Sequence, residues 1–543
     1  MSIYKQFCEE TVDENGRLTA FSIRCAENFN FGYDVIDALG ASEPERRALV
    51  WCNTEGTVKT LTFADLSRLS SRVAHILSDA GVRRGDRVMV ALKRHIEYWY
   101  LLPALHKLGA VAVPVTHMLT EDDFLYRLDC GGIRAVVAAD DENVLQKLGA
   151  AAQRAQQPPL LWTTAPGYAP FRDLHAEMEH APETLERRET LASEPILMYF
   201  TSGTTGYPKA VLHDHTYPLA HIITAKYWQQ VEDGGLHFTV AETGWGKASW
   251  GKMYGQWLCG SAVMVYDFDN FDPKQLTNIV NQFSVTSFCA PPTVYRYLVK
   301  KGMSDMPSLR HASTAGEALS PEVFHRFQEK TGLELMEGYG QTESTLILAN
   351  FRGAPSKPGS LGLASPLYHV ALLKEDGTYA APGELGELVI IPPENGRQFG
   401  IFSGYLGDEA LYRYVWRGGV YHTGDIAWQD EDGYYWFHGR IDDVIKSGGY
   451  RIGPYEIENI LIGHEAVLEC SVVGVPDTLR GQAIKAFVVT APGYVQDAAL
   501  QKQLRDYCNM RLAEYKWVRY VELVPELPKT ISGKIRKNIL RQS

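Results

Sequence analysis

Short hydrophobic runs alternate with longer amphipathic stretches through the first part of the chain. Between residues 61 and about 140, the stretch ADLSRLSSRVAHILSDAG has apolar residues at helical spacing, and the runs DRVMVAL, GAVAVPV and IRAVVAA have the length of strands. This alternation is typical of α/β layers built on largely parallel sheets. A second stretch of this kind runs from ILMYF (196–200) through VTSFCAPP (285–292) to SPEVFHRFQEKTG (320–332). The pattern predicts an α/β fold with layered subdomains.

The pattern changes twice towards the C-terminus. A turn-rich stretch from about 353 to 439 contains GELGELVII and DGYYWFHGR, and it predicts a small β subdomain. After Arg440 come a new strand, a double glycine and a helix that opens with Pro454 and has Ile457, Ile460 and Leu461 on one face. Strands SVVGV (471–475) and AIKAFVVTA (483–491) complete a unit of about 100 residues, an ordinary domain size. We predict an N-terminal domain, 1–440, and a small, mobile α+β C-terminal domain, 441–543.

Composition and charge exclude several classes of function. The formal net charge of −12 would repel a nucleic acid backbone, and no apolar run is long enough to span a bilayer. The N-terminal residues lack the basic start and apolar stretch of a secretory signal, and the eight cysteines form no close pair of the zinc or redox kind. We therefore expect a cytoplasmic protein with reduced thiols and without a nucleic acid partner or a membrane span. The sequence leaves a homo-oligomer open.

The strongest candidate for chemistry is the segment TSGTTGYPKAV, which follows the apolar run ILMYF. Gly203 and Gly206 allow backbone N–H groups to turn inward, and Lys209 supplies positive charge, so the segment can wrap a phosphate. The spacing between Gly206 and Lys209, and the β-like segment that follows, differ from the P-loop of NTPases. The hydroxyl residues that would add donors to this loop are Thr201, Ser202, Thr204 and Thr205.

Six motifs in a fixed order resemble the adenylate-forming superfamily of acyl-CoA synthetases, adenylation domains and luciferases. They are TSGTTGYPK (201–209), GE (316–317), EGYGQTE (337–343), YHTGD (421–425), GRIDDVIKSGGYRIGP (439–454) and PKTISGKIRK (528–537). One short motif alone would be a weak signal, but six in order, covering nearly the whole chain, are very specific. THML near residue 116 and the stretch SGGYRIGP look most like the acetyl-CoA and medium-chain synthetase branch.

The resemblance implies an AMP-forming acyl-CoA synthetase. In such an enzyme ATP and a small carboxylic acid give an acyl-adenylate and pyrophosphate, and coenzyme A then takes the acyl group. ATP, Mg²⁺ and coenzyme A are the implied ligands. Two alternatives stay open: a stand-alone adenylation enzyme that loads a carrier protein, and an aromatic acid-CoA ligase.

The resemblance also implies roles for single residues in the adenylation step. Tyr339 would stack on adenine, Thr342 would contact the phosphate and the acyl carboxylate, and Glu343 would bind Mg²⁺, which favours one or two carboxylates plus substrate oxygens. Asp425 would accept hydrogen bonds from both ribose hydroxyls. Lys534 would bridge the acyl carboxylate and the α-phosphate, where repulsion between two anions rises. The other residues implied around the nucleotide are Gly316, Glu317, Glu337, Gly338, Gly340, Gln341 and Arg440.

The resemblance places the hinge between the two domains at Asp442. By residue type alone, Asp442 would be a turn or capping acid, and Lys534 would be one of several cations in a basic tail. For the thioester step the implied residues lie in the C-terminal domain: Gly448, Gly449, Tyr450 and Arg451 along the pantetheine tunnel, and Arg480, Tyr515 and Lys516 near the nucleotide of coenzyme A. The segment YKWVR departs from the family pattern, because a proline often follows the second aromatic residue.

The acyl substrate is the least defined part of the prediction. Gly340 stands where acetate-restricted relatives carry tryptophan, which implies a deeper pocket for a short- to medium-chain or branched acid. Lys247 and Lys252 could meet a polar acid, although solvated lysines are more common. Ser249 and Lys252 also fit the S-x-x-K pattern of a serine acyl hydrolase, but roughly one or two such patterns occur by chance in a chain of this length. Three aromatic residues either wall the acyl pocket or belong to the core: Trp245, Trp250 and Tyr254.

Overall fold

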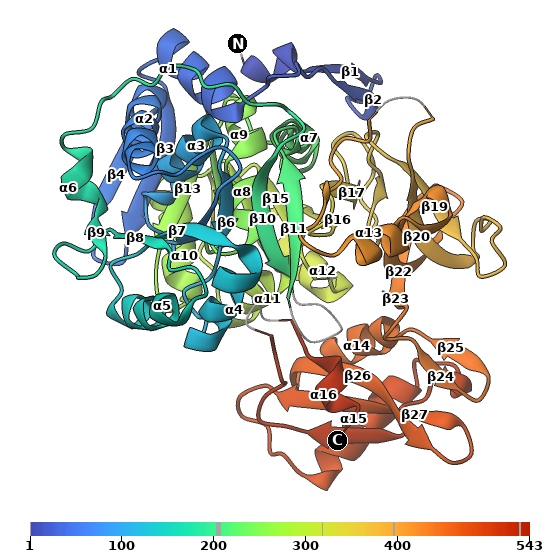
Figure 1. The fold of residues 1–543 in the computed structure, drawn as a ribbon. Helices are drawn as coiled ribbons and strands as arrows, with labels where there is room; N and C mark the ends of the chain where they lie inside the picture. The colour runs from blue at the N-terminus through green and yellow to red at the C-terminus, as the bar shows by residue number, and fades with distance from the viewer. Residues whose placement is uncertain (1, 202–207, 318, 395–396, 531–533, 543) are drawn as a thin grey trace.

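The computed structural model describes residues 2–201, 208–317, 319–394, 397–530 and 534–542. Figure 1 shows two layered units: the N-terminal residues form the large upper body, and the residues after β23 (Tyr435–Arg440) form a smaller unit below it. This arrangement confirms the predicted fold class of a large α/β domain followed by a small α+β domain. Within the described ranges, no helix is long and apolar enough to cross a bilayer.

The first large sheet carries the candidate phosphate loop near one edge. The apolar runs predicted as strands form its parallel centre, and β10 pairs with β11 in antiparallel fashion, with Thr201 opposite Lys209. The loop therefore joins two strands, whereas the P-loop of NTPases joins a strand to a helix. In spatial order the strands are β21 (Gly404–Tyr405), β11 (Lys209–Asp214), β10 (Pro195–Thr201), β6 (Val111–Pro114), β5 (Arg87–Ala91), β7 (Ile133–Ala138), β8 (Leu160–Thr163) and β9 (Arg172–Asp173).

The second large sheet brings two predicted motifs to the same end. Strands β15 and β16 are parallel neighbours, with Ala315 opposite Gly338, so the GE motif after β15 lies beside EGYGQTE at the end of β16. In spatial order the strands are β18 (Leu363–Ala364), β17 (Leu346–Ala349), β16 (Leu335–Gly340), β15 (His311–Ala315), β14 (Ser287–Ala290), β12 (Leu236–Thr239), β13 (Ala262–Asp267), β3 (Arg47–Asn53) and β4 (Val58–Thr62). Ligands of α/β proteins commonly bind at this end of a parallel sheet.

Helices pack between and around the two large sheets. Thr62 caps α2 (Phe63–Asp79) in a capping box with Asp65, and every residue of α3 (Tyr98–Leu108) is buried. One hydrophobic core unites these two helices and α9 (Tyr254–Leu258) with strands of both sheets. The other helices of this body are α1 (Ala38–Ser42), α4 (Glu121–Gly131), α5 (Glu142–Arg154), α6 (Leu174–Met178), α7 (Tyr217–Ile223), α8 (Gly246–Trp250), α10 (Pro273–Gln282), α11 (Pro292–Lys301), α12 (Pro321–Thr331) and α13 (Glu409–Val415).

The predicted β subdomain is an antiparallel sheet next to the site. Its register places Asp425 of β22 directly opposite Arg440 of β23, because the two strands are adjacent. The strands, in spatial order, are β19 (His369–Leu373), β20 (Leu385–Ile391), β22 (Tyr421–Gln429) and β23. A separate hairpin near the N-terminus consists of β1 (Cys8–Val12) and β2 (Leu18–Ile23).

The C-terminal unit combines a three-stranded sheet, a hairpin and helices. The predicted helix after Pro454 is α14, and Ile457 and Leu461 on its inner face are fully buried. These side chains pack in a core of their own with α15 and the sheet. The elements are β24 (Ile445–Ser447), β25 (Tyr450–Ile452), α14 (Pro454–Ile462), β26 (Val467–Asp477), β27 (Gly481–Thr490), α15 (Ala498–Asn509), the short 3₁₀ helix Glu514–Lys516, β28 (Tyr520–Leu523) and α16 (Lys537–Leu540).

Candidate active site

A buried carboxylate, Asp425, is the centre of the predicted nucleotide site. The hydroxyl of Tyr339 and the side-chain amide of Gln341 both donate to its Oδ2, the latter at 2.8 Å. Arg440 Nη1 lies 3.8 Å from the other oxygen, Oδ1. Burial raises the pKa of Asp425, and the charge of Arg440 opposes that rise. Oδ2 of Asp425 is therefore held by two hydrogen bonds from the protein. Oδ1 accepts neither of these bonds and lies near the Arg440 guanidinium.

The neighbours of Asp425 are themselves oriented. The hydroxyl of Tyr421 donates to Oε1 of Gln341 at 2.9 Å, which fixes the amide with its nitrogen towards Asp425. Arg440 Nε donates to Asp442 at 3.1 Å, and Asp442 is exposed to solvent. Lys534 is exposed and close enough for its charge to lower the pKa of Asp425. Lys534 of the C-terminal unit thus contributes positive charge at a carboxylate of the large domain.

The second acidic residue of the EGYGQTE motif, Glu343, lies beside the phosphate-loop hairpin. The Tyr405 hydroxyl donates to Glu343 Oε1 at 2.9 Å, and the backbone N–H of Phe402 donates to the Glu343 carbonyl at 2.7 Å. Tyr405 lies on β21, whose partner strand β11 begins with Lys209, and the Lys209 ammonium is 5.8 Å from the centre of the Tyr405 ring. A carboxylate and a lysine therefore flank the end of the predicted phosphate loop.

A histidine that the sequence reasoning missed supports the neighbouring residue, Thr342. The Thr342 carbonyl accepts a hydrogen bond of 2.7 Å from Nε2 of His213. Burial lowers the pKa of His213 to about 4, so the ring is neutral at physiological pH and Nε2 carries its proton. His213 follows the phosphate loop on β11, and that position was the only signal that could have indicated it.

Glu337 and Gly338 are buried on β16, directly before Tyr339. Glu337 is 3 % exposed, accepts one hydrogen bond of 3.1 Å from the Leu319 backbone, and has no described partner for Oε2. Burial raises its pKa to about 8. A Cβ on Gly338 would lie 2.6 Å from the ring of Trp228, so only glycine fits this contact. Both residues are therefore enclosed by the fold next to Tyr339, whereas Gly340 is exposed.

The GE motif forms an exposed turn at the end of β15. Gly316 has φ of +107°, a conformation that favours glycine, and Glu317 accepts a hydrogen bond of 2.9 Å from the Thr293 hydroxyl. Lys247, at the start of α8, donates to the Ala315 carbonyl at 3.0 Å. Lys247 therefore reaches the strand end that carries the GE motif.

The two residues of the S-x-x-K pattern bond to different partners. Ser249 shares a 2.7 Å hydrogen bond with the Tyr98 hydroxyl, whereas Lys252 donates to the Ala241 carbonyl at 3.4 Å and lies near aromatic rings. Both side chains are buried. Of the three aromatic residues considered for the acyl pocket, Tyr254 belongs to the core, and Trp245 and Trp250 are half-buried.

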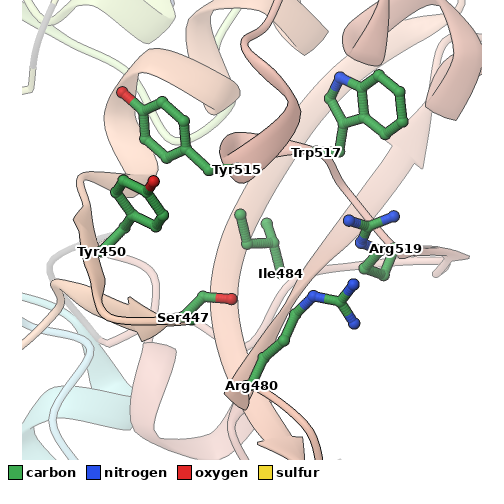
Figure 2. A pocket seen from close by; sticks show the side chains of 8 residues that line it. Ser447, Tyr450, Arg480, Ile484, Tyr515, Trp517 and Arg519 are labelled. Atoms are coloured by element: carbon green, nitrogen blue, oxygen red, sulfur yellow. The ribbon is translucent and has the colours of Figure 1, made fainter.

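A pocket in the C-terminal unit gathers four of the predicted coenzyme A residues (Figure 2): Gly448, Tyr450, Arg480 and Tyr515. Its cavity of about 100 Å³ is also lined by Ser447, Ile484, Trp517 and Arg519. The rings of Tyr450 and Tyr515 stack with centres 4.4 Å apart. The side chains of Arg480 and Arg519 lie on the other side of Ile484 in Figure 2.

Three predicted coenzyme A residues lie elsewhere. Lys516 forms an ion pair of 2.6 Å with Glu456, and Arg451 pairs with Glu375 of the large domain. Gly449 is exposed and does not line the pocket. In the phosphate loop, five predicted residues lie outside the described residues: Ser202, Gly203, Thr204, Thr205 and Gly206.

Comparison with known proteins gives consistent matches along the chain. The model of the AMP-binding enzyme family matches residues 37–406, and that of the AMP-binding enzyme C-terminal domain matches residues 456–534. The human mitochondrial acyl-coenzyme A synthetase ACSM4 is 39 % identical over 95 % of this chain and 90 % of its own length. Rat mitochondrial acyl-coenzyme A synthetase ACSM3 is 36 % identical over 96 % of this chain and 92 % of its own length.

Solved structures share the fold over nearly the whole chain. The anthranilate CoA ligase AuaEII in complex with anthranoyl-AMP has a TM-score of 0.86 and 27 % identity, covering 95 % of this chain and 98 % of its own. An acyl-CoA synthetase of Brucella canis has a TM-score of 0.72 and 32 % identity, covering 95 % and 94 %.

The relatives correct one expectation from the sequence. The human and rat synthetases are mitochondrial proteins, so the expectation of a cytoplasmic location is contradicted. That expectation rested on the missing secretory signal, which concerns export and carries no information about organelles. The resemblance to adenylate-forming enzymes, which rested on six ordered motifs, is confirmed, because the AMP-binding enzyme model covers more than half of the chain. The chain belongs to the AMP-binding enzyme family.

Proposed function

We propose that this protein is an AMP-forming acyl-CoA synthetase that activates a short- to medium-chain carboxylic acid. The observation that carries the proposal is the buried Asp425 held by Tyr339, Gln341 and Arg440, at which Lys534 of the C-terminal unit contributes positive charge. The names of the human and rat relatives, which match over almost their full lengths, support the same activity. The substrate panel described below determines which acid is preferred, and whether that acid is aromatic.

The residues around Asp425 fit the nucleoside part of ATP. Tyr339 and Gln341 occupy one carboxylate oxygen, and the other is left to accept hydrogen bonds from the ribose hydroxyls. The ring of Tyr339 provides a flat face for adenine. Arg440 adds positive charge beside the ribose, so we assign these four residues to nucleotide binding.

The donor set at Glu343 fits Mg²⁺ held together with phosphate oxygens. Tyr405 engages Glu343 Oε1, and among the described residues no group of three or more acidic, histidine or cysteine side chains could hold a metal alone. A single protein carboxylate that relies on substrate oxygens is the usual arrangement for Mg²⁺ with a nucleotide. When bound there, Mg²⁺ would neutralise charge on the phosphates. Lys209 and the hydroxyl loop would complete the phosphate site.

Lys534 is assigned to the chemical step of adenylation. An oxygen of the acid attacks the α-phosphorus, a phosphorus–oxygen bond breaks, and pyrophosphate leaves. Two anions must approach each other in this step, and a cation between them is worth most where the repulsion is highest. Thr342, which lies next to Glu343 and is fixed by His213, would contact the same phosphate.

The second half-reaction requires a different orientation of the C-terminal unit. We propose that this unit, residues 441–543, turns about Asp442 so that the thiol of coenzyme A attacks the adenylate carbonyl, AMP leaves and the thiol proton is released. Asp442 suits a hinge, because it is exposed and, among the described residues, its side chain pairs only with the nearby Arg440. The pocket with Tyr450, Arg480 and Tyr515 would hold the nucleotide of coenzyme A.

The proposal is tested by separating the two half-reactions in one variant. Lys534→Ala should lower acid-dependent ATP–pyrophosphate exchange by about 100-fold or more, because the cation between the two anions is lost. Thioester formation from supplied acyl-adenylate should fall far less. Lys529→Ala, which removes a cation of the same loop that pairs with Glu469, is the matched control.

The wild-type enzyme is assayed with a panel of straight-chain, branched and aromatic acids, and with free coenzyme A against a phosphopantetheinyl carrier protein. If none of the acids in the panel supports ATP–pyrophosphate exchange, the adenylating activity is refuted. A thioester with the carrier alone would identify a carrier-loading enzyme instead.

A further inference from the structure

The N-terminal hairpin carries an acidic residue, Glu10, that contacts the body of the large domain. Its Oε1 accepts hydrogen bonds from the Tyr4 hydroxyl at 3.0 Å and from the Lys226 ammonium, and its Oε2 accepts one of 2.7 Å from the Tyr227 hydroxyl. Burial would raise the pKa of Glu10, but the hydrogen bonds from Lys226 and Tyr227 lower it, so the carboxylate is ionised at physiological pH. One charged residue of β1 therefore holds two consecutive residues that follow it by 216 and 217 positions.

Tyr227 belongs to a π-helical segment, Thr224–Trp228, that directly continues α7. Single π-helical turns are rare and occur frequently at functional sites. The backbone N–H of Arg352 donates to the Tyr227 carbonyl at 2.9 Å. Nε2 of His311, on β15, donates to the Trp228 carbonyl at 2.7 Å. These two backbone contacts and the hydrogen bond from the Tyr227 hydroxyl together fix the segment within the large domain.

The last residue of the segment, Trp228, supports the strand that carries the EGYGQTE motif. Its side chain is fully buried, and its indole N–H donates to the Met336 carbonyl of β16 at 3.1 Å. The ring also packs directly against Gly338, where a Cβ would lie 2.6 Å from it. Gly338 immediately precedes Tyr339, whose hydroxyl donates to Asp425. A shift of Trp228 would therefore move the strand that positions Tyr339.

We propose that Glu10 is a positioning residue for the nucleotide site: by holding the Tyr227 hydroxyl it fixes the π-helical segment and keeps Trp228 against β16. The inference rests on the proposed function, in which Tyr339 binds the adenine. Tyr227 and Trp228 are consecutive, so the backbone between them transmits a displacement of one to the other. Without Glu10 the segment would keep its two carbonyl contacts but lose its hydrogen bond to a charged group, which is of the stronger kind.

Two single variants and a control test this role. Glu10→Gln keeps the size of the side chain but loses the charge that pairs with Lys226, and Tyr227→Phe removes only the hydroxyl. Each should raise the KM for ATP about threefold or more and leave kcat at saturating ATP within about twofold, because bound ATP itself orders the site. Steady-state ATP–pyrophosphate exchange with the best acid of the panel measures both constants. Glu9→Gln is the matched control, since Glu9 precedes Glu10 on β1, is exposed and pairs with Arg24.

The double variant shows whether Glu10 acts through Tyr227. Its KM for ATP should equal that of the weaker-binding single variant and not the product of the two effects, because both substitutions break the same contact.

A purely structural role predicts a different result. It would lower the midpoint of thermal unfolding and kcat, through the fraction of folded enzyme, and leave the KM for ATP unchanged. That result, an equal rise of KM in Glu9→Gln, or fully additive effects in the double variant would overturn the inference and leave the proposed function intact. If Glu10→Gln does not fold, the KM of Tyr227→Phe decides alone. If the wild-type enzyme shows no acid-dependent exchange, the proposed function fails and the inference falls with it.

Discussion

Tyr405 and Glu343 form the contact on which the proposed magnesium site depends. The tyrosine comes from a short edge strand, β21, and the glutamate from the loop after β16, so the hydroxyl joins two segments 62 residues apart. The hydrogen bond occupies Oε1 and limits the rotation of the carboxylate. Burial, together with the neighbouring carboxylate, raises the pKa of Tyr405, so the phenol remains protonated and donates at any physiological pH. Tyr405 is thus a positioning residue for Glu343.

Tyr405→Phe should therefore weaken binding of ATP in the presence of Mg²⁺. The variant loses one hydrogen bond to a charged group, worth about 1.5 to 3 kcal/mol, which corresponds to roughly tenfold or more in affinity. Calorimetric titration of ATP with Mg²⁺ and with EDTA measures the effect, and the affinity in EDTA should change much less. Tyr414→Phe, at an exposed tyrosine of α13, is the control. Equal weakening in both buffers would show that Tyr405 supports the fold and not the metal site.

Lys252 is a buried lysine that forms no ion pair with an acidic residue in the described part of the chain, and its effect on stability depends on pH. The side chain is 1 % exposed, and burial, helped by the charge of Arg94, lowers its pKa to about 7. The unfolded chain has a lysine pKa of about 10.4 and binds more protons between these two values, so stability should rise as the pH increases from about 7 to about 10. Below pH 7 the full cost of the buried charge remains.

Lys252→Met should stabilise the protein at pH 6 and have a much smaller effect at pH 9. The difference is on the order of a few kcal/mol, since each unit of pKa shift corresponds to about 1.4 kcal/mol. Thermal unfolding at the two pH values measures it. Lys107→Met is an opposite control, because Lys107 is buried but lies 2.7 Å from Asp37, and its loss should destabilise at both pH values. If Lys252→Met stabilised the protein equally at pH 6 and pH 9, the lowered pKa of Lys252 would be refuted.

At the scale of elements, local patterns identified most of the fold. The capping residue and apolar spacing of α2 are properties of neighbouring residues, and so are Pro454 and the buried Ile457 and Leu461 of α14. The apolar runs that became β5, β6 and β7 are buried on both faces, which explains their lack of polar alternation. Each of these elements follows from interactions within a few turns or within one sheet layer.

The assembly of the site depended on pairing that no local pattern contains. The register that places Asp425 opposite Arg440 is formed between separate strands, and His213 meets Thr342 across 129 residues of sequence. Glu10 was missed for a related reason: its partner Tyr227 lies 217 residues further along the chain. Lys516 was assigned to coenzyme A by its motif, but in this structure Glu456 on α14 pairs with it.

At the scale of the whole molecule, a few contacts hold the C-terminal unit against the large domain. The hydroxyl of Tyr455 on α14 donates to the Leu319 carbonyl at 3.3 Å, and Lys300 donates to the Val467 carbonyl at 3.1 Å. The Leu319 N–H in turn donates to Glu337 of the EGYGQTE motif. The orientation in which Lys534 contributes charge at Asp425 is thus connected, through Tyr455 and Leu319, to Glu337 beside the proposed nucleotide site. Rotation about Asp442 would break this connection.

Tyr455→Phe should shift the balance of orientations away from adenylation. The lost hydrogen bond is worth about 0.5 to 1.5 kcal/mol net, so the population ratio should change by about two- to tenfold. The ratio of thioester formation from supplied adenylate to ATP–pyrophosphate exchange should rise by a similar factor, because in the proposed mechanism the contact belongs to the adenylating orientation. Tyr520→Phe, at an exposed tyrosine on β28 of the same unit, controls for effects of removing a hydroxyl. A parallel fall in both half-reactions would mean that Tyr455 stabilises the C-terminal unit itself, and the coupling between its orientation and Glu337 would have to be abandoned.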